Sequence, residues 1–73
     1  MSEEVLAEMV ANVWKIVAAV GDEVAEGDTI CILESMKMEI PVEAPVSGRL
    51  TEIGVTEGGV VQEGDTIALI EPS

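Results

Sequence analysis

The sequence contains no histidine, tyrosine or phenylalanine, and its 73 residues include only one cysteine and one tryptophan. Histidine is the commonest general base and metal ligand, so its absence argues against a self-contained active site. None of the four serines has a candidate base nearby, and we expect no catalytic residue. The 15 carboxylates are scattered and match no calcium-binding loop, so we expect no metal site.

Positive charge is also scarce, because three Lys and Arg residues oppose 15 Asp and Glu residues and give a formal net charge of −12. Nucleic acids and anionic lipid surfaces both require clustered basic side chains, so we expect no nucleic-acid partner and no membrane partner. The acidic surface instead favours basic surfaces of partner proteins. No stretch approaches the ~20 apolar residues of a membrane span.

The single cysteine, Cys31, cannot form an internal disulfide. It lies in the apolar run TICIL, which indicates a small buried hydrophobic side chain. Acidic residues occupy the N-terminus, where a targeting sequence would carry bases. Together these features predict a cytoplasmic protein in a reducing compartment, and we expect a monomer in isolation.

The residues that are abundant indicate a folded domain, since 48 % of the chain is apolar. The length suits one small domain, residues 1–73. An internal repeat divides it: EGDTI occurs at 26–30 and again at 63–67, an offset of 37 residues. Aligning 11–34 with 48–71 gives nine identities in 24 positions. We therefore expect two similar half-domains, packed about a pseudo-twofold axis.

Both copies of the repeat have the pattern of β-strands, with short runs of Val, Ile and Leu between turn residues. The predicted strands are 12–17, 29–34, 48–55 and 66–71, and 5–9 is interpreted as the first strand of the chain. EGD suits a tight turn, because glycine supplies a positive φ and aspartate can bond back to the backbone. The spacing of these signals predicts an all-β sandwich or flattened barrel.

The segment between the two repeats, ESMKME (34–39), predicts a β-hairpin with Met36 and Lys37 as a two-residue loop. This register pairs Ser35 with Met38, Glu34 with Glu39 and Leu33 with Ile40, so that apolar residues face each other nearer the core. Two local preferences are then broken. Such loops favour Asn-Gly or Asp-Gly, because both residues need φ > 0, and two facing glutamates repel each other. Broken preferences of this kind are typical of functional sites.

ESMKME resembles the biotin attachment motif of biotinyl domains, whose core is Met-Lys-Met. The repeat, the mid-chain lysine hairpin and the later A-P-x-x-G (Ala44, Pro45, Gly48) are similar to the biotinyl/lipoyl attachment family. The resemblance covers about Val5 to Glu71 and is closest to small stand-alone biotinylated proteins of the biotin carboxyl carrier type. Residues 9–12 differ from the Pro-Met-Pro-Gly-like stretch of many members, and the chain has no room for the "thumb" insertion of some carriers.

The resemblance implies a flattened β-barrel or sandwich of two four-stranded antiparallel sheets with a quasi-twofold axis. It implies that Lys37, at an exposed hairpin tip, carries covalent biotin. The chain would then be a non-catalytic carrier that shuttles carboxyl groups between partner sites of a biotin-dependent carboxylase. The implied partners are biotin protein ligase and the biotin carboxylase and carboxyltransferase components. The implied recognition flanks of the modified lysine are Glu34, Ser35, Met36, Met38 and Glu39.

Two alternatives to a biotin carrier remain open at this point. A lipoyl carrier is disfavoured, because lipoyl domains usually have Asp-Lys-Ala where this chain has Met36, Lys37 and Met38. An unmodified binding module would keep the fold without the carrier role. Trp14 is either a binding aromatic or, as we favour, a partly buried strand residue. Arg49 is interpreted as a solvated or salt-bridged surface group.

Overall fold

The computed structural model describes residues 2–73, and over that range it contains strands and no helix. Over the same range, the chain therefore offers no helix that could span a membrane. In chain order the strands are β1 (Glu3–Leu6), β2 (Ala11–Ile16), β3 (Glu23–Val24), β4 (Thr29–Ser35), β5 (Met38–Glu43), β6 (Gly48–Ile53), β7 (Val60–Val61) and β8 (Thr66–Pro72).

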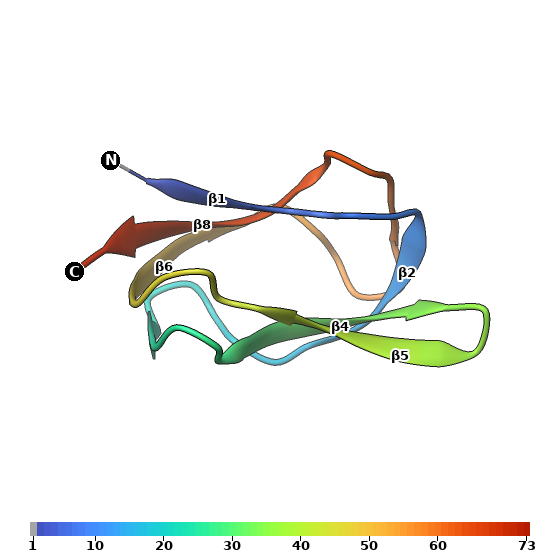
Figure 1. The fold of residues 1–73 in the computed structure, drawn as a ribbon, viewed down its shortest axis with the longest axis horizontal. Helices are drawn as coiled ribbons and strands as arrows, with labels where there is room; N and C mark the ends of the chain where they lie inside the picture. The colour runs from blue at the N-terminus through green and yellow to red at the C-terminus, as the bar shows by residue number, and fades with distance from the viewer. Residues whose placement is uncertain (1) are drawn as a thin grey trace.

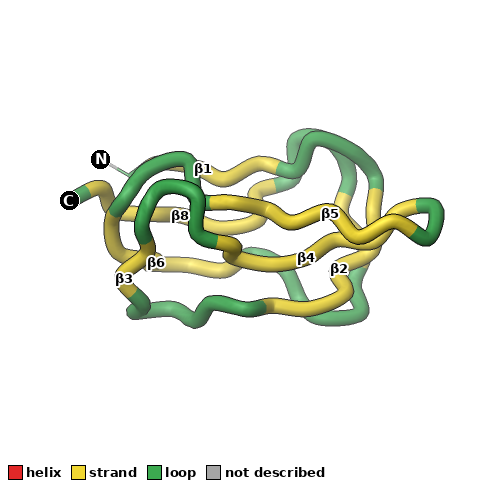
Figure 2. Tube along the Cα trace, turned by 60° about the horizontal axis from the view of Figure 1, so that its bottom comes forward, coloured by secondary structure: helices red, strands yellow, loops and turns green. Residues whose placement is uncertain are grey.

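The strands form two four-stranded antiparallel sheets. One sheet has the order β5-β4-β2-β7 and contains the predicted hairpin, and we call it the hairpin sheet. The other has the order β1-β8-β6-β3 and contains both chain ends, and we call it the terminal sheet. The molecule measures 35 × 18 × 17 Å, with the β4–β5 hairpin at one end and the two termini at the other (Figures 1 and 2).

The 37-residue repeat of the sequence is a repeat of structure. β2, β3 and β4 recur as β6, β7 and β8, each displaced by 37 residues, and the order of one sheet maps onto that of the other. The register shift between Val13 and Lys15 in β2 recurs between Leu50 and Glu52 in β6. The predicted two-sheet architecture with an internal quasi-twofold is confirmed.

The core lies between the sheets and is built from equivalent residues of both halves. The inward-facing side chains of the strands are apolar, and many of the outward-facing ones are polar, as is common for a sheet with one buried face. No buried polar side chain occurs in the described part of the chain. Buried pairs separated by 37 residues are Ala7 and Ala44, Val13 and Leu50, Val24 and Val61, Ile30 and Ile67, Cys31 and Ala68, and Leu33 and Ile70.

The EGD turns join the two halves through backbone hydrogen bonds. The N–H of Gly27 donates to the carbonyl of Ala44 (2.9 Å), and the N–H of Ala44 donates to the carbonyl of Asp28 (2.8 Å). Gly27 has the positive φ (94°) that the sequence predicted. The same two bonds recur between Gly64, Asp65 and Ala7 in the other half. Each half-domain is therefore anchored on the other, as expected of units too small to fold alone.

The aspartates of the two EGD turns bond back to the backbone, as predicted, and Asp22 in the Gly21-Asp22 turn does the same. The Oδ2 atoms of Asp22, Asp28 and Asp65 accept from the N–H groups of Ala19 (2.9 Å), Ala25 (2.9 Å) and Gln62 (2.8 Å). Three elements differ from the sequence prediction. β3 and β7 lie outside the predicted strands, because each is a two-residue strand whose partner belongs to the other half of the chain. β1 starts two residues earlier than predicted and ends at Leu6.

Candidate functional site

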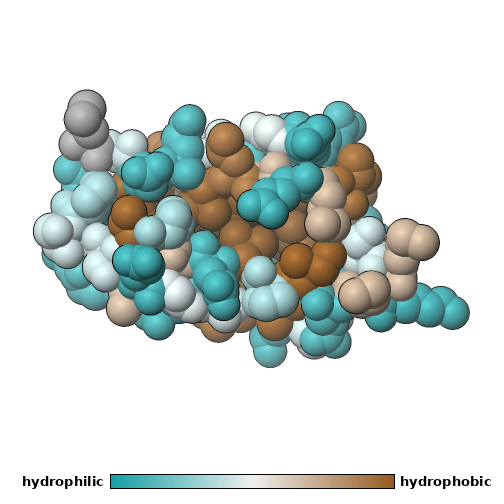
Figure 3. Space-filling view, in the orientation of Figure 1, coloured by the Kyte–Doolittle hydropathy of each residue, from teal (hydrophilic) through white to brown (hydrophobic). Residues whose placement is uncertain are grey.

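The β4–β5 hairpin has the register that the sequence predicted. Ser35 pairs with Met38, Glu34 with Glu39 and Leu33 with Ile40. Met36 and Lys37 are therefore the two-residue loop, at the far end of the molecule from the termini (Figure 1). In the space-filling view this tip projects beyond the body of the domain (Figure 3). The hairpin thus presents Lys37 clear of the rest of the chain.

Both loop residues have a left-handed backbone, with φ of 53° at Met36 and 66° at Lys37. They are the positive-φ residues other than glycine among those described. This conformation brings Cβ close to the following carbonyl, and it costs about 1–3 kcal/mol per residue. Glycine would avoid that cost but would remove the side chains. The side chains of Met36 and Lys37 are therefore present at this turn despite their cost to local stability.

The residues beside Lys37 are accessible to a partner. Met36 is 92 % exposed and Met38 is 66 % exposed, so neither belongs to the core. Glu39 is also exposed, while Glu34 and Ser35 are half-buried. Unbranched methionine side chains can adapt to more than one partner surface. The tip thus combines a fixed backbone with flexible apolar side chains around one amine.

The amine of Lys37 has no ion-pair partner among residues 2–73. Glu34 and Glu39, three positions before and two positions after Lys37, pair across the hairpin, where like charges repel by a few tenths of a kcal/mol. Lys15, the second lysine, lies within β2, where it pairs with Ile32 across to β4. Two lysines of one chain are thus presented differently: one at an apex and one along a sheet.

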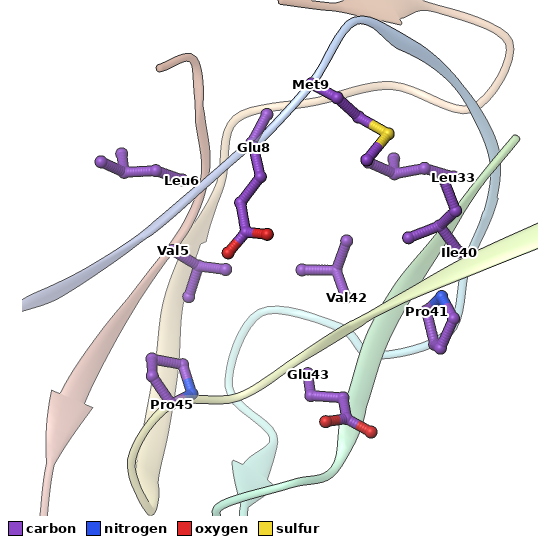
Figure 4. A pocket seen from close by; sticks show the side chains of 11 residues that line it. Val5, Leu6, Glu8, Met9, Leu33, Ile40, Pro41, Val42, Glu43 and Pro45 are labelled. Atoms are coloured by element: carbon purple, nitrogen blue, oxygen red, sulfur yellow. The ribbon is translucent and has the colours of Figure 1, made fainter. Parts of the chain in front are cut away.

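A separate apolar groove lies on the open seam between the edge strands β1 and β5. Its volume is about 330 Å³, and side chains of both edges point into it, including Val5, Met9, Ile40 and Val42 (Figure 4). Apolar surface across this face is also visible in Figure 3. Lys37 is not among the residues that line the groove. The candidate site is therefore a protruding side chain rather than a pocket.

Three further sequence predictions have structural outcomes. Cys31 is fully buried, as predicted, and this burial raises the pKa of its thiol. Arg49 is on the surface and pairs with Glu23 at 3.5 Å. Trp14 lies in β2 with half of its surface (50 %) exposed, which agrees with the predicted partly buried strand residue. It occupies the extra position of the β2 bulge, which the sequence pattern alone does not reveal.

Comparisons with known proteins agree with this architecture. Residues 3–70 match the family of biotin and lipoyl attachment domains described as "Biotin-requiring enzyme". The chain is 50 % identical over 70 residues to the "Biotinylated protein TB7.3 homolog" of Mycobacterium leprae, covering 96 % of this chain and 99 % of that protein. It is 40 % identical over 67 residues to the pyruvate carboxylase of Bacillus subtilis, covering 92 % of this chain and 6 % of that protein.

A solved structure has the same fold. The Kluyveromyces lactis urea carboxylase superposes with a TM-score of 0.91 at 41 % identity, and the match covers 97 % of this chain and 6 % of that one. The chain therefore matches a small part of that much longer protein and nearly all of the small mycobacterial relative. Because the family match extends over almost the whole chain, with the lysine hairpin at one end of the two-sheet fold, the chain belongs to the biotin/lipoyl attachment domain family.

Proposed function

We propose that this chain is a biotin carrier domain that biotin protein ligase modifies on the amine of Lys37. The observation that carries the proposal is the left-handed turn, which holds Lys37 at the apex of a rigid hairpin despite its local cost. The relatives support it, because several carry the word biotinylated in their names. As a carrier, the chain acts with a biotin-dependent carboxylase, which the likeness to pyruvate carboxylase and urea carboxylase supports.

The residues at the hairpin tip suit covalent attachment of biotin. An amide bond requires a primary amine that a second active site can reach, and Lys37 is exposed and has no ion pair with residues 2–73. Bound there, biotin would supply a ureido group that carries a carboxyl group between active sites. The chain contributes position: the paired strands β4 and β5 fix the tip, and the exposed Met36 and Met38 give the partner apolar contacts.

The two lysines of the chain provide a matched experiment. We expect Lys37→Arg to abolish labelling by biotin protein ligase with biotin and ATP, because arginine keeps the charge but cannot form the amide. Lys15→Arg, the control, should be labelled like the unaltered chain. A streptavidin blot after the reaction reads both results. A positive blot for Lys37→Arg would contradict the assignment of the site.

A lipoyl carrier remains the alternative within this family. The flanks Met36 and Met38 favour biotin, since lipoyl domains usually have Asp and Ala on the two sides of the modified lysine. Intact mass after expression in cells that contain both ligases separates the two groups, because the mass added by biotin differs from that added by lipoate. We expect the biotin increment alone. A lipoyl increment would refute the biotin assignment while leaving Lys37 as the modified residue.

We further propose that residues 1–73 act as one biotinyl domain, which is monomeric in isolation and cytoplasmic. The shared core of the two halves supports a single domain, because neither half could bury its apolar face alone. The buried free thiol of Cys31 supports a reducing compartment. Sedimentation of the purified chain tests the monomer, and fractionation of native cells tests the location.

A further inference from the structure

We propose that the outer face of the hairpin sheet is the surface on which biotin protein ligase docks, and that Trp14 is its apolar anchor. The inference rests on the proposed function, because it identifies the surface through which that enzyme holds the domain while it acts on Lys37. The internal twofold provides a second sheet of the same architecture, with which this face can be compared.

The first row of this face crosses the sheet beside Trp14. Lys15 pairs with Ile32, and Ile32 pairs with Pro41, so these residues lie side by side on β2, β4 and β5. Trp14 is the extra residue of the bulge next to Lys15, and the bulge leaves its side chain half exposed. Three apolar side chains therefore lie together on the outside of the sheet that carries Lys37.

The same row of the terminal sheet is polar. The positions 37 residues away from Trp14, Lys15 and Ile32 are Thr51, Glu52 and Leu69, and Glu4 takes the place of Pro41. Leu69 is thus the one apolar residue of four. The hydroxyl of Thr51 donates to the carbonyl of Leu69 (3.3 Å). The row of the hairpin sheet and the row of the terminal sheet have the same strand pairing and the same bulge. The fold therefore does not explain why a tryptophan occupies position 14.

The second row differs in the same direction. Val60, which is 64 % exposed, pairs with Asn12 on the hairpin sheet. The equivalent residues of the terminal sheet are Glu23 and Arg49, which form an ion pair at 3.5 Å. In this row the terminal face therefore pairs the charges of Glu23 and Arg49, whereas the hairpin face exposes Val60 and continues through Asn12 to Glu34 and Glu39. One position shows the opposite pattern: the hairpin sheet has Glu43 where the terminal sheet has the apolar Leu6. Glu43 is at the end of β5 farthest from the hairpin loop.

The distance between Trp14 and Lys37 suits a single interface. Trp14 lies beside the pair of Lys15 and Ile32, and Lys37 is five positions along the chain from Ile32. At about 3.3 Å per residue, the anchor lies roughly 16 Å from the backbone of Lys37. A standard interface buries about 800 Å² of each partner, which is a patch roughly 30 Å across. A ligase that receives Lys37 in its active site therefore covers Trp14 if it approaches from the outer face.

The residues of this face indicate which kind of ligase surface would be complementary to it. Tryptophan is enriched among the residues that dominate binding energy, and it requires a desolvated apolar depression on the partner. Glu34 and Glu39 lie between that anchor and the hairpin tip. The complementary surface is therefore an apolar socket with basic side chains between the socket and the active site.

Steady-state biotinylation with a purified ligase that modifies the unaltered chain tests this surface. Trp14→Thr places the residue of the equivalent terminal position into β2, and threonine suits a strand. We expect KM for the domain to rise about tenfold or more, with kcat within about twofold, since an anchor lost far from the amine weakens binding and not chemistry. Thr51→Trp, the matched control on the opposite sheet, should leave both constants unchanged.

A second measurement separates binding from chemistry. The Lys37→Arg chain cannot be labelled, and we expect it to inhibit labelling of the unaltered chain competitively. Adding Trp14→Thr to it should raise the inhibition constant by the same factor as KM. Unchanged constants for Trp14→Thr, or an equal loss for Thr51→Trp, would overturn the docking surface while labelling at Lys37 stands. Absence of labelling of Lys37 in the unaltered chain would instead refute the proposed function itself.

Discussion

The two ends of the molecule are built from equivalent strands but differ in what the strands lead to. At one end β4 continues into β5 through Met36 and Lys37. At the other end the equivalent strands, β8 and β1, carry the C-terminus and the N-terminus, which lie side by side (Figure 1). The burial pattern of β2 is the same as that of β6, and that of β3 is the same as that of β7. The halves therefore share their interior and differ at one tip and on one outer face.

This comparison separates residues that serve the fold from residues that serve a partner. A feature present in both halves, such as the EGD turn or the inward Ile30 and Ile67, is explained by packing. A feature present in only one half has no such explanation. The left-handed Met36 and Lys37 and the exposed Trp14 are of this second kind. An internal repeat thus provides a reference within a single chain.

The largest expected effect tests the equivalence of the two halves of the core. Ile30→Ala and Ile67→Ala each remove a fully buried side chain, and we expect each to lower the free energy of unfolding by about 2–5 kcal/mol. Urea unfolding measures both values, and the twofold predicts that they agree to within about 1 kcal/mol. If either variant fails to fold, Ile30→Val and Ile67→Val give the same comparison at about 0.5–1.5 kcal/mol each. Clearly unequal losses of stability would show that the two halves of the core are not energetically equivalent, although Ile30 and Ile67 are equally buried.

A smaller effect tests the strain at the hairpin tip. Met36→Asn places a residue that tolerates the left-handed backbone at φ 53°, so we expect the free energy of unfolding to rise by about 1–2 kcal/mol. The measurement is again urea unfolding. Met38→Asn is the control, because Met38 begins strand β5 and should gain nothing from asparagine. A Met36→Asn chain no more stable than the original would mean that the turn stores no strain.

The smallest expected effect concerns the one core pair that differs in chemistry, Cys31 and Ala68. Burial raises the pKa of the Cys31 thiol above its ordinary value of 9.0, so the thiol of the unfolded chain ionises first as the pH rises. Below pH 9 the thiol is protonated in both the folded and the unfolded chain, so the fold keeps its full stability. Above pH 9 the thiol ionises in the unfolded chain while it stays protonated in the folded chain, and the free energy of unfolding falls. We expect the stability advantage of the original chain over Cys31→Ala to fall by about 1 kcal/mol between pH 9 and pH 10. A constant difference in urea unfolding across that range would contradict the sign.

Much of the fold could be predicted from local patterns. The hairpin register was correct, because a two-residue loop leaves one pairing that keeps Leu33 opposite Ile40. The turn conformations were correct at EGD, where glycine and aspartate have specific backbone preferences. β3 and β7 were missed, because a strand of two residues has no period of its own and exists only through pairing with the other half. The bulge in β2 was also missed, because the sequence pattern does not show that Lys15 follows Trp14 on the exposed side of the strand.

The amino-acid sequence by itself determined the two-part architecture, the turns between strands and the lysine at the apex, because each depends on spacing and on the conformational preferences of a few residues. Only the tertiary structure decided which residues share an outer face. Trp14, Ile32 and Pro41 are far apart in the chain and become neighbours through strand pairing, which also places Thr51, Leu69 and Glu4 together on the opposite sheet. The contrast between those faces is a property of non-local hydrogen bonding, and no short segment contains it.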